Sequence, residues 1–508
     1  MFQYGGLALM KKIYGDLLRR IRLNRKRLGD DIYRDTTLLS YEGSWPGDFQ
    51  GRAILALTSL YHALDGYKDE QDDVLNQLND IFLHIDPYLN KHYYFGNVYD
   101  GETIDEQQIS GNSWYLRGLI NYYKLTNNEK YLKQIEVITN EYLLKLGNHY
   151  QEYPLDARRE NGEVGGHISE GVFSNWKLSS DIGCAFIMLD GLTAVYEVIK
   201  LDNLRVIIEQ IIDMFLKIDF VNLQCQTHAT LSCARGIYRF YQNTKDSKYL
   251  EHAMRIFDTY ISNGMTYDYS NINWFNRPET WTEPCCVIDS MILAKELFIE
   301  TKNEKYLKLF NKIFNNSVRT FQRDNGGAGC STCAYDQNYE LKNHLYEAFF
   351  CCTMRLGEGL YEIEDFSVIK ENNAILIPTN VEVQYENDDI IYINNEIYKY
   401  NKIVINAKKL IKIDKIYIYI PDGVKLTKYH KSNNLLEVNI KENQLLEIPL
   451  EFEIQQINDL YYYGDVLLTR KQEENGYYFL IDNNKYSLIY DNSNFKESEL
   501  NKRVQYVR

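Results

Sequence analysis

Two short segments of the chain contain adjacent cysteines, a residue pattern that could do metal or redox chemistry. They are WTEPCC at residues 281–286 and AFFCCT at residues 348–353. Adjacent residues point in different directions on a helix or a strand, so packing alone rarely requires such a pair twice. The two pairs could be buried core thiols, a redox pair or the two halves of a metal site.

The residues around the first pair predict where a helix begins. Pro284 suits the first turn of a helix, because its missing N–H would have no partner there. A helix through CCVIDSMILAKELFIET would put Glu283 and Cys285 at its N-terminus, where exposed N–H groups favour thiolates and other anions. The second pair lies in HLYEAFFCCTMRLGEGL, which is also compatible with a helix. One carboxylate and three thiolates can complete a tetrahedral zinc shell, although this spacing is not that of a zinc finger.

The cysteines as a set indicate thiols or metal ligands. All nine lie between residues 184 and 352. The first residues, MFQYGGLALMKKIYGDLL, lack the basic start, apolar run and cleavage site of a signal peptide. No run of about 18 apolar residues is present, so we expect no membrane span. We therefore expect a cytoplasmic protein, in which an odd number of cysteines argues against a set of disulfides.

The overall composition limits the partners of the chain. Its 508 residues carry a net charge of −15, with no basic cluster beyond the short stretch 19–27, so we expect no nucleic-acid partner. The 44 tyrosines could stack on sugar faces while their phenols bond to sugar hydroxyls. We expect a small-molecule carbohydrate as the partner, and a homodimer stays open.

A recurring phrase predicts the architecture of the first part of the chain. It reads LTNNEKYLKQ at 125–134, TKDSKYLEHA at 244–253 and TKNEKYLKLF at 301–310, with a looser version from Tyr67. Each copy is a polar turn that leads into a helix, with Asn, Asp or Ser available as a cap. A period of about 57 residues with helix–turn–helix content indicates an array of α-hairpins. Six or seven hairpins would fit a closed (α/α)6 toroid, with an open solenoid as the alternative.

The pattern changes after about residue 366. DDIIYINNEIYKYNKIVINAKKLIKIDKIYIYI and LLEVNIKENQLLEIPLEFEI alternate apolar and polar residues and are rich in Ile, Tyr and Val. This alternation predicts antiparallel strands in a β-sandwich-like domain at 366–508. Because that part contains no cysteine, we expect the chemistry in the helical domain at 1–365.

Several of these motifs together resemble a known family. Glu-Pro-Cys at 283–285 with the helix and KYL turn after it, NNSV at 315–318, and Cys-Cys at 351–352 followed by Arg355 are similar to the thiol-dependent β-L-arabinofuranosidase family of glycoside hydrolases. THATLSCARGIYRFYQNTKDSKYL also resembles a helix of that family that starts with a histidine. The resemblance implies an (α/α)6 barrel followed by a β-sandwich.

The resemblance also implies a set of site residues and a cofactor. Glu283, Cys285, Cys351 and Cys352 would bind Zn²⁺, with Cys351 as the nucleophile and His228 as a sugar contact. Zinc would lower the thiol pKa and give a thiolate at neutral pH. The thiolate would attack the anomeric carbon, and hydrolysis of the thioglycosyl intermediate would give net retention.

The sequence departs from the family pattern at three places. The family has a general acid/base glutamate upstream of the Glu-x-Cys motif, where this chain has Tyr267. We predict that Glu279 takes this catalytic role, with Asp268 as the alternative. Arg117 occupies the region of one family histidine, and AFF at 348–350 replaces another. These departures predict an altered sugar pocket, so the identity of the sugar does not follow from the resemblance.

Further residues are predicted to bind the substrate. Arg277 and Trp281 lie in the loop that enters the cysteine-bearing helix. His167 stands among glycines in NGEVGGHISEGVF, which predicts a loop near the barrel mouth. Asp48 in SWPGDFQGR, with Arg52 beside it, lies where the family approaches its substrate.

The remaining cysteines have simpler interpretations. Cys184, Cys225 and Cys233 are predicted to be buried small hydrophobic residues, and Cys286 to lie in the core or beside the site. The CxxC at 330–333 stands on a Gly-rich stretch and could be half of a zinc site, a redox pair or a replacement for a family ligand.

The sequence therefore predicts a retaining, zinc-dependent glycoside hydrolase of the β-L-arabinofuranosidase type. Two alternatives stay open. One is a zinc-independent sugar epimerase or lyase on an α-toroid. The other is a non-enzymatic helical scaffold with a structural zinc that binds a partner on a concave face.

Overall fold

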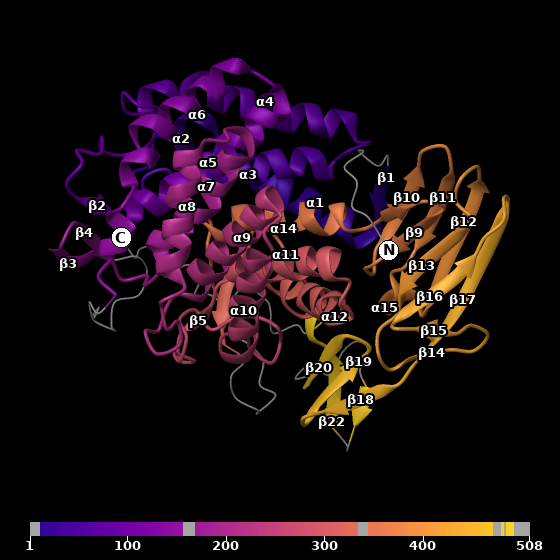
Figure 1. Ribbon diagram of the computed structural model, residues 1–508. Coiled ribbons are helices and arrows are strands. Elements are labelled where there is room, and N and C mark those ends of the chain that lie inside the picture. The colour runs from indigo at the N-terminus through magenta and orange to yellow at the C-terminus, as the bar shows by residue number, and fades with distance from the viewer. Residues whose placement is uncertain (1–10, 156–167, 334–343, 471–478, 482–483, 492–508) are drawn as a thin grey trace.

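The computed structural model describes residues 11–155, 168–333, 344–470, 479–481 and 484–491. Among the described residues, most of those before 366 are in helices and most of those after it are in strands (Figure 1). The change falls between α14, which ends at Asp365, and β8, which begins at Ile369. The described residues contain no helix long and apolar enough to cross a membrane.

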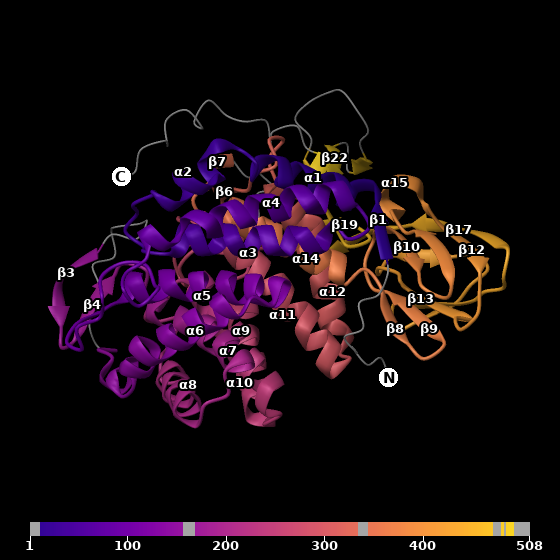
Figure 2. The same cartoon turned by 90° about the horizontal axis from the view of Figure 1, so that it is seen from above.

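Six helices among the described residues contact one another in a closed order. Helix α3 packs on α5, α5 on α7, α7 on α9, α9 on α11, α11 on α14, and α14 returns to α3 (Figure 2). Their bounds are α3 Asp48–Ala63, α5 Glu106–Thr126, α7 Met188–Val198, α9 Thr227–Thr244, α11 Pro284–Thr301 and α14 Cys352–Asp365. The contacts therefore form a ring, and most residues of its six helices are buried.

Each helix of the ring also packs against one outer helix. The outer helices are α4 Lys68–His84, α6 Glu129–Glu141, α8 Asp202–Phe215, α10 Ser247–Asn263, α12 Glu304–Ile313 and α1 Gly15–Arg27, which pack on α3, α5, α7, α9, α11 and α14 in that order. On α12 and α10 the apolar residues repeat at helical spacing and face the ring, as expected for surface helices. Shorter helices are α2 Asp35–Leu39, α13 Arg319–Phe321 and α15 Ile397–Tyr400.

The three close copies of the recurring phrase form the turns between inner and outer helices. In each, the inner helix ends on a residue with left-handed backbone, and an Asn or Asp side chain accepts a hydrogen bond from the first turn of the outer helix. The left-handed residues are Asn127, Lys245 and Lys302, and the caps are Asn128, Asp246 and Asn303. The sequence prediction of capped turns is confirmed.

Glycine allows two of the ring helices to approach closely. A Cβ added to Gly51 on α3 would lie 2.2 Å from the backbone nitrogen of Tyr115 on α5. No side chain fits in that space, so alanine at this position would force the two helices apart.

The described strands after α14, together with β1 near the start of the chain, form three sheets. The first has the order β1-β10-β11-β12-β17-β14, the second β15-β16-β13-β9-β8, and the third β18-β19-β20-β22-β21. In β11 and β13 buried residues alternate with more exposed ones, as the period of two predicts. The bounds of the strands in the first two sheets are β1 Lys11–Tyr14, β8 Ile369–Glu371, β9 Ala374–Ile377, β10 Glu382–Glu386, β11 Ile390–Asn394, β12 Lys402–Lys409, β13 Lys415–Tyr419, β14 Val424–Leu426, β15 Lys431–Ser432, β16 Leu435–Asn439 and β17 Gln444–Phe452.

The third sheet has its own apolar cluster. It comprises β18 Ile454–Ile457, β19 Leu460–Tyr463, β20 Val466–Arg470, β21 Phe479–Ile481 and β22 Asn484–Leu488. Asn316, in the π-helical turn η6 at Phe314–Val318, donates to the carbonyl of Asp465 (2.8 Å) and accepts from the amide of Leu467 (2.7 Å). These bonds tie the NNSV stretch to this sheet.

Strand β1, near the start of the chain, pairs with a strand of the β-rich segment. It lies in the first 20 residues and pairs antiparallel with β10, with Lys11 opposite Tyr385. The sequence interpretation placed residues 1–365 in one unit and 366–508 in another, whereas these four residues extend a sheet made otherwise by the later segment. A single apolar core runs from the helices into this sheet.

Candidate metal centre

A small sheet brings the two cysteine segments together. Its strands are β5 Trp281–Thr282, β6 Gly329–Thr332 and β7 His344–Glu347, in the order β5-β6-β7. β5 leads directly into α11, and β7 precedes α14. The GGAGCSTC segment therefore supplies the central strand that joins the two halves of the site, with Thr282 opposite Ser331 and Gly329 opposite Glu347.

Four side chains converge where these two helices begin. One ligand atom from each of Glu283, Cys285, Cys351 and Cys352 lies within 4.8 Å of those of the other three. Cys352 Sγ lies 3.4 Å from both Cys285 Sγ and Cys351 Sγ. Cys285 and Cys352 are fully buried, while Cys351 is partly exposed. The four residues proposed as ligands from the sequence thus form one cluster.

The helix start predicted from the sequence positions the carboxylate of the cluster. Glu283 is the N-cap of α11, and Pro284 opens its first turn. The Glu283 amide donates to Asn271 Oδ1 (2.8 Å), and Gln226 Nε2 donates to Glu283 Oε2 (3.4 Å). Cys351 is the N-cap residue of α14, so the second pair straddles a helix start.

His228 connects the cluster to the interior of the ring. Its Nδ1 lies 3.3 Å from Glu283 Oε1, and its Nε2 lies 3.4 Å from Asp289 Oδ2. The imidazole is buried and stacks on Trp114, with the ring centroids 5.7 Å apart. The structure therefore places this predicted substrate residue beside the cluster, in contact with the carboxylate of Glu283.

A second helix of the ring brings a cation to the thiols. Arg52 Nη1 lies 3.6 Å from Cys285 Sγ, and Arg52 Nε donates to Asp48 Oδ2 (2.7 Å). The guanidinium lies 4.0 Å from the ring centroid of Trp114. The predicted substrate residue Asp48 therefore pairs with Arg52, and Arg52 in turn contacts the thiol of Cys285.

Below the cluster, the interior of the ring is filled with ion pairs. Asp289 accepts hydrogen bonds from Ser232 Oγ (2.8 Å) and Arg235 Nη1 (2.7 Å), and it pairs with Arg355. Glu358 accepts from Arg235 Nη2 (2.9 Å) and pairs with Arg355. All five side chains are buried.

Arg117, which stands in the region of a family histidine, belongs to these ion pairs. Its Nη2 lies 3.2 Å from Glu358 Oε1, and it also pairs with Asp190. Burial lowers the pKa of Arg117 to about 10, and Asp190 partly opposes this effect. The arginine is therefore engaged with carboxylates inside the ring.

The thiols of the cluster have strongly raised pKa values. Burial raises the pKa of Cys285 and of Cys352 well above the ordinary thiol value. For Cys351 the hydrogen bond to Cys285 lowers the pKa, but the bond to Cys352 and burial outweigh it. Thiols this close cannot all ionise unless a cation lies among them. The donor set, three sulfurs and one carboxylate, is suited to such a cation.

The residues of the loop before α11 lie further out. The side chain of Glu279 is 62% exposed, and its Oε1 accepts from Arg277 Nε at 2.8 Å. This hydrogen bond lowers the pKa of Glu279. Trp281 packs edge-on against Trp274 at 5.5 Å and begins β5. This loop therefore lies at the rim of the site, just before Glu283, and outside the cluster. Its rim residues are Arg277, Glu279 and Trp281.

The other predicted carboxylate, Asp268, is not in the cluster. Asp268 is buried in a turn, where it accepts from Thr266 Oγ1 (2.6 Å) and Ser270 Oγ (3.2 Å). Its backbone carbonyl accepts from Ser317 on η6, next to the third sheet. His167 lies outside the described residues.

The CxxC contributes one cysteine near the cluster. A hydrogen bond with Cys330 is among the causes that raise the pKa of Cys352, after burial and the bond to Cys285. Cys333 instead donates to the carbonyls of Asn271 and Thr280, each at 3.5 Å. Cys184, Cys225, Cys233 and Cys286 are buried.

Sequence reasoning missed several residues around the site. Trp114, Arg235 and Asp289 had no recognised role, although His228, Ser232 and Arg235 recur at helical spacing on α9. Tyr41 was also missed: burial and then the charges of Asp48 and Cys351 raise the pKa of its phenol.

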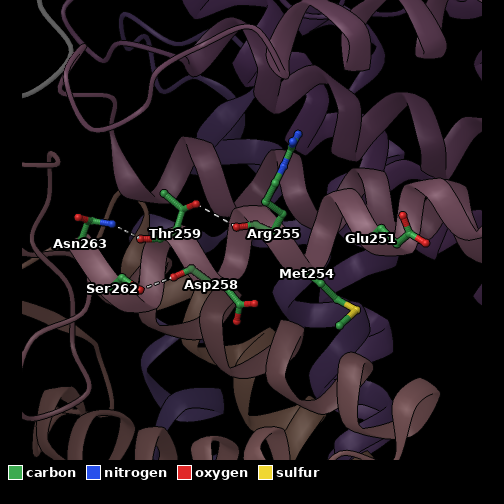
Figure 3. Close-up of a pocket in the computed structure, with 7 residues that line it drawn as sticks. All are labelled: Glu251, Met254, Arg255, Asp258, Thr259, Ser262 and Asn263. Carbon is green, nitrogen blue, oxygen red and sulfur yellow. Dashed lines mark hydrogen bonds between the residues drawn. The ribbon is translucent and has the colours of Figure 1, made fainter.

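A surface pocket lies elsewhere, on the outer helix α10. Its lining residues are Glu251, Met254, Arg255, Asp258, Thr259, Ser262 and Asn263 (Figure 3). Thr259, Ser262 and Asn263 donate to carbonyls one turn earlier in the same helix. The pocket contains none of the cluster residues, so it is not the candidate site.

Comparison with known proteins places the chain in a family. The family model described as beta-L-arabinofuranosidase, GH127 catalytic domain, matches residues 92–365. The chain belongs to this GH127 family. It is therefore a glycoside hydrolase, which favours this prediction over the epimerase, lyase and scaffold alternatives. The matched residues include the whole thiol cluster, whereas Asp48 and Arg52 precede them. No curated protein matches the chain.

Solved structures show the same overall fold at low sequence identity. A glycoside hydrolase aligns with a TM-score of 0.61 and 10% identity, over 90% of this chain and 81% of that chain. The GH127 beta-arabinofuranosidase BT3674 aligns with a TM-score of 0.58 and 10% identity, over 90% and 80% of the two chains. A GH127 beta-L-arabinofuranosidase from Geobacillus stearothermophilus T6 aligns with a TM-score of 0.52 and 12% identity, over 89% and 80%.

Proposed function

We propose that this GH127 member is a retaining β-L-arabinofuranosidase-type hydrolase with a zinc-bound cysteine as nucleophile. The observation that carries the proposal is the convergence of Glu283, Cys285, Cys351 and Cys352 within 4.8 Å. The substrate would be a small oligosaccharide or glycoconjugate, held at the mouth of an (α/α)6 barrel that a β-sandwich follows.

The donor set supports zinc as the ion. Thiolates are soft ligands that zinc accepts in tetrahedral sites, and Ca²⁺ and Mg²⁺ prefer oxygen. When bound, zinc would supply the positive charge that keeps the thiols ionised at neutral pH.

Exposure distinguishes the nucleophile from the other two cysteines of the cluster. Cys351 is partly exposed, whereas Cys285 and Cys352 are buried. In the first step Cys351 Sγ forms a bond to the anomeric carbon, the glycosidic C–O bond breaks, and the leaving oxygen takes a proton from an acid. In the second step water forms the new C–O bond, gives up a proton to the base, and the C–S bond breaks. Two inversions give net retention.

Glu279 is the proposed acid and base. In the described structure Arg277 lowers its pKa, which suits the ionised base of the second step. Donation in the first step requires a protonated carboxyl, so the substrate must weaken the contact with Arg277. The proposed sugar contacts are His228, Arg277, Trp281 and Asp48, together with His167.

A trapping experiment tests the proposal. The wild-type protein is mixed with p-nitrophenyl β-L-arabinofuranoside, quenched in acid and mapped by peptide mass spectrometry. We expect a mass increase of one pentosyl group on the peptide that contains Cys351. Cys233→Ala is the matched control, since Cys233 is a buried thiol on α9 outside the cluster. An adduct on a carboxylate residue instead would contradict the cysteine nucleophile.

A further inference from the structure

Arg52 occupies a position at the thiol cluster for which the reaction scheme gives no role. It lies on α3, outside the residues that the family model matches. We propose that Arg52, aligned by Asp48, is the fixed positive charge that stabilises the ion-loaded thiol cluster through an N–H···S hydrogen bond to Cys285. This inference rests on the proposed function, because it needs an ion held by the cluster.

Three contacts hold the guanidinium of Arg52 in place. Nε donates to Asp48 Oδ2 at 2.7 Å, Nη1 lies 3.6 Å from Cys285 Sγ, and the planar group stacks at 4.0 Å over Trp114. The side chain is only 6% exposed. An arginine fixed in this way loses little further entropy when it bonds to the sulfur.

Charge explains why the cluster needs such a partner. Three thiolates and one carboxylate carry four negative charges, and a divalent ion neutralises only half of them. The rest must be compensated in a buried site, where an unpaired charge is costly. The Asp48–Arg52 pair leaves a nitrogen for this purpose: Nη1 donates to the sulfur, while the carboxylate, 14% exposed, pairs with Nε.

Arg355, another buried arginine that lies against Trp114, already has carboxylate partners. Arg355 lies 4.6 Å from the Trp114 ring centroid, and it pairs with Asp289 and Glu358. Arg52 pairs with Asp48 through Nε and keeps Nη1 for Cys285. The N–H···S bond also makes Cys285 a weaker electron donor to the ion than Cys351, the partly exposed sulfur.

The chain contains a closely matched ion pair without a thiol. Arg20 Nε lies 2.7 Å from Asp16 Oδ2 with the same spacing of four residues on α1, and the Arg20 side chain is 10% exposed. Its other partners are the carbonyl of Arg319 and Gln322. Arg20→Met therefore removes the same kind of ion pair and leaves the thiol cluster intact.

Zinc affinity is the first test. Wild-type protein and the variants Arg52→Met, Arg52→Lys, Asp48→Asn and Arg20→Met are titrated with zinc against a chromophoric chelator. We expect Arg52→Met to weaken binding by about 10–100-fold, the usual effect of losing a hydrogen-bond partner of a metal ligand. Arg52→Lys should recover part of the loss, Asp48→Asn should cause a smaller loss, and Arg20→Met should bind as the wild type does.

Cobalt substitution provides a readout that a merely structural role would not change. With Co²⁺ as the probe, removal of the N–H···S bond should shift the sulfur-to-cobalt charge-transfer band to longer wavelength in Arg52→Met and not in Arg20→Met. Unchanged affinity and an unchanged band in a folded Arg52→Met protein would overturn the inference while the proposed function stands. Wild-type protein that takes up no zinc would overturn both.

Discussion

The thiol cluster and the ion pairs beneath it are two groups of buried charge-bearing residues in one ring of helices. We call the ion pairs the lower group and the thiol cluster the upper group. In the lower group each carboxylate contacts arginines. Asp289 contacts Arg235 and Arg355, and Glu358 contacts both of these and Arg117. In the upper group four potential anions converge on one another, and burial raises the pKa of Cys285 and Cys352.

This difference separates a structural role from a functional one. Carboxylates that are paired with arginines stabilise the interior of the ring. Three sulfurs and a carboxylate that converge with Arg52 as a neighbouring cation are suited to binding a metal ion. His228 lies between the two, within 3.4 Å of a carboxylate of each. Changes in the upper group should therefore affect activity, and changes in the lower group should affect stability.

The largest expected effect follows removal of the nucleophile. Cys351→Ala should lower kcat/KM by about 10⁴-fold or more, because no other partly exposed thiol of the cluster can replace it. The thermal unfolding midpoint should stay close to that of the wild type. Steady-state kinetics and calorimetry on Cys351→Ala, with Cys233→Ala as the control, measure both. An active Cys351→Ala enzyme would refute the mechanism.

The lower group should show the opposite pattern. Asp289→Asn removes one of the two carboxylates that Arg235 and Arg355 share and leaves them Glu358. Removing one partner of a buried ion pair costs about 3–5 kcal/mol. Urea unfolding of Asp289→Asn should show a loss of this size. A variant as stable as the wild type would show that these charges do not support the fold.

Replacing the rim residue Glu279 should lower activity most on substrates whose leaving group needs a proton. Glu279→Gln should lower kcat by about 10²–10³-fold on a sugar leaving group, within the range for general acid–base catalysis. A p-nitrophenolate leaving group needs less protonation, so the first step should then be less affected. An equal loss on both substrates, measured under conditions where the first step limits the rate, would argue for a binding role instead. Full activity on both would remove Glu279 from the mechanism.

The smallest expected effect concerns a partly compensated carboxylate at the far end of α14. Burial raises the pKa of Glu364 to about 7, against the opposing effect of Lys11 from β1, whose Nζ lies 3.3 Å away. The folded state therefore keeps a proton that the unfolded state releases near pH 4.5. The corresponding stability is complete below that pH and is lost as the pH rises through about 7.

The free energy of unfolding should fall by roughly 3 kcal/mol over this pH range. Glu364→Gln should abolish this dependence on pH. Unfolding free energies of wild type and Glu364→Gln at pH 4.5 and pH 7 give the difference. Parallel pH dependence of the two proteins would contradict the assignment.

The sequence predicted the features that depend on local interactions. Pro284 opens α11, and Asn128, Asp246 and Asn303 cap outer helices, because caps and turns are decided by neighbouring residues. The cluster itself followed from the family resemblance of the two cysteine segments, not from their spacing.

The features that were not predicted depend on contacts between distant residues. β6 joins the two cysteine segments, although its own sequence suggested only a Gly-rich CxxC loop. Arg52 reaches Cys285 across 233 positions of the chain, and β1 pairs with a strand more than 360 residues later. Neither a periodicity nor a local motif encodes such pairs.

Metal content is the most direct test of the central claim that the two cysteine pairs form one zinc site. Protein purified without chelators and without a metal-affinity tag is submitted to elemental analysis beside Cys351→Ser. The account predicts about one zinc per chain in the wild type and less in the variant. Wild-type protein without zinc would contradict the claim and leave the cysteine pairs as packing or redox features.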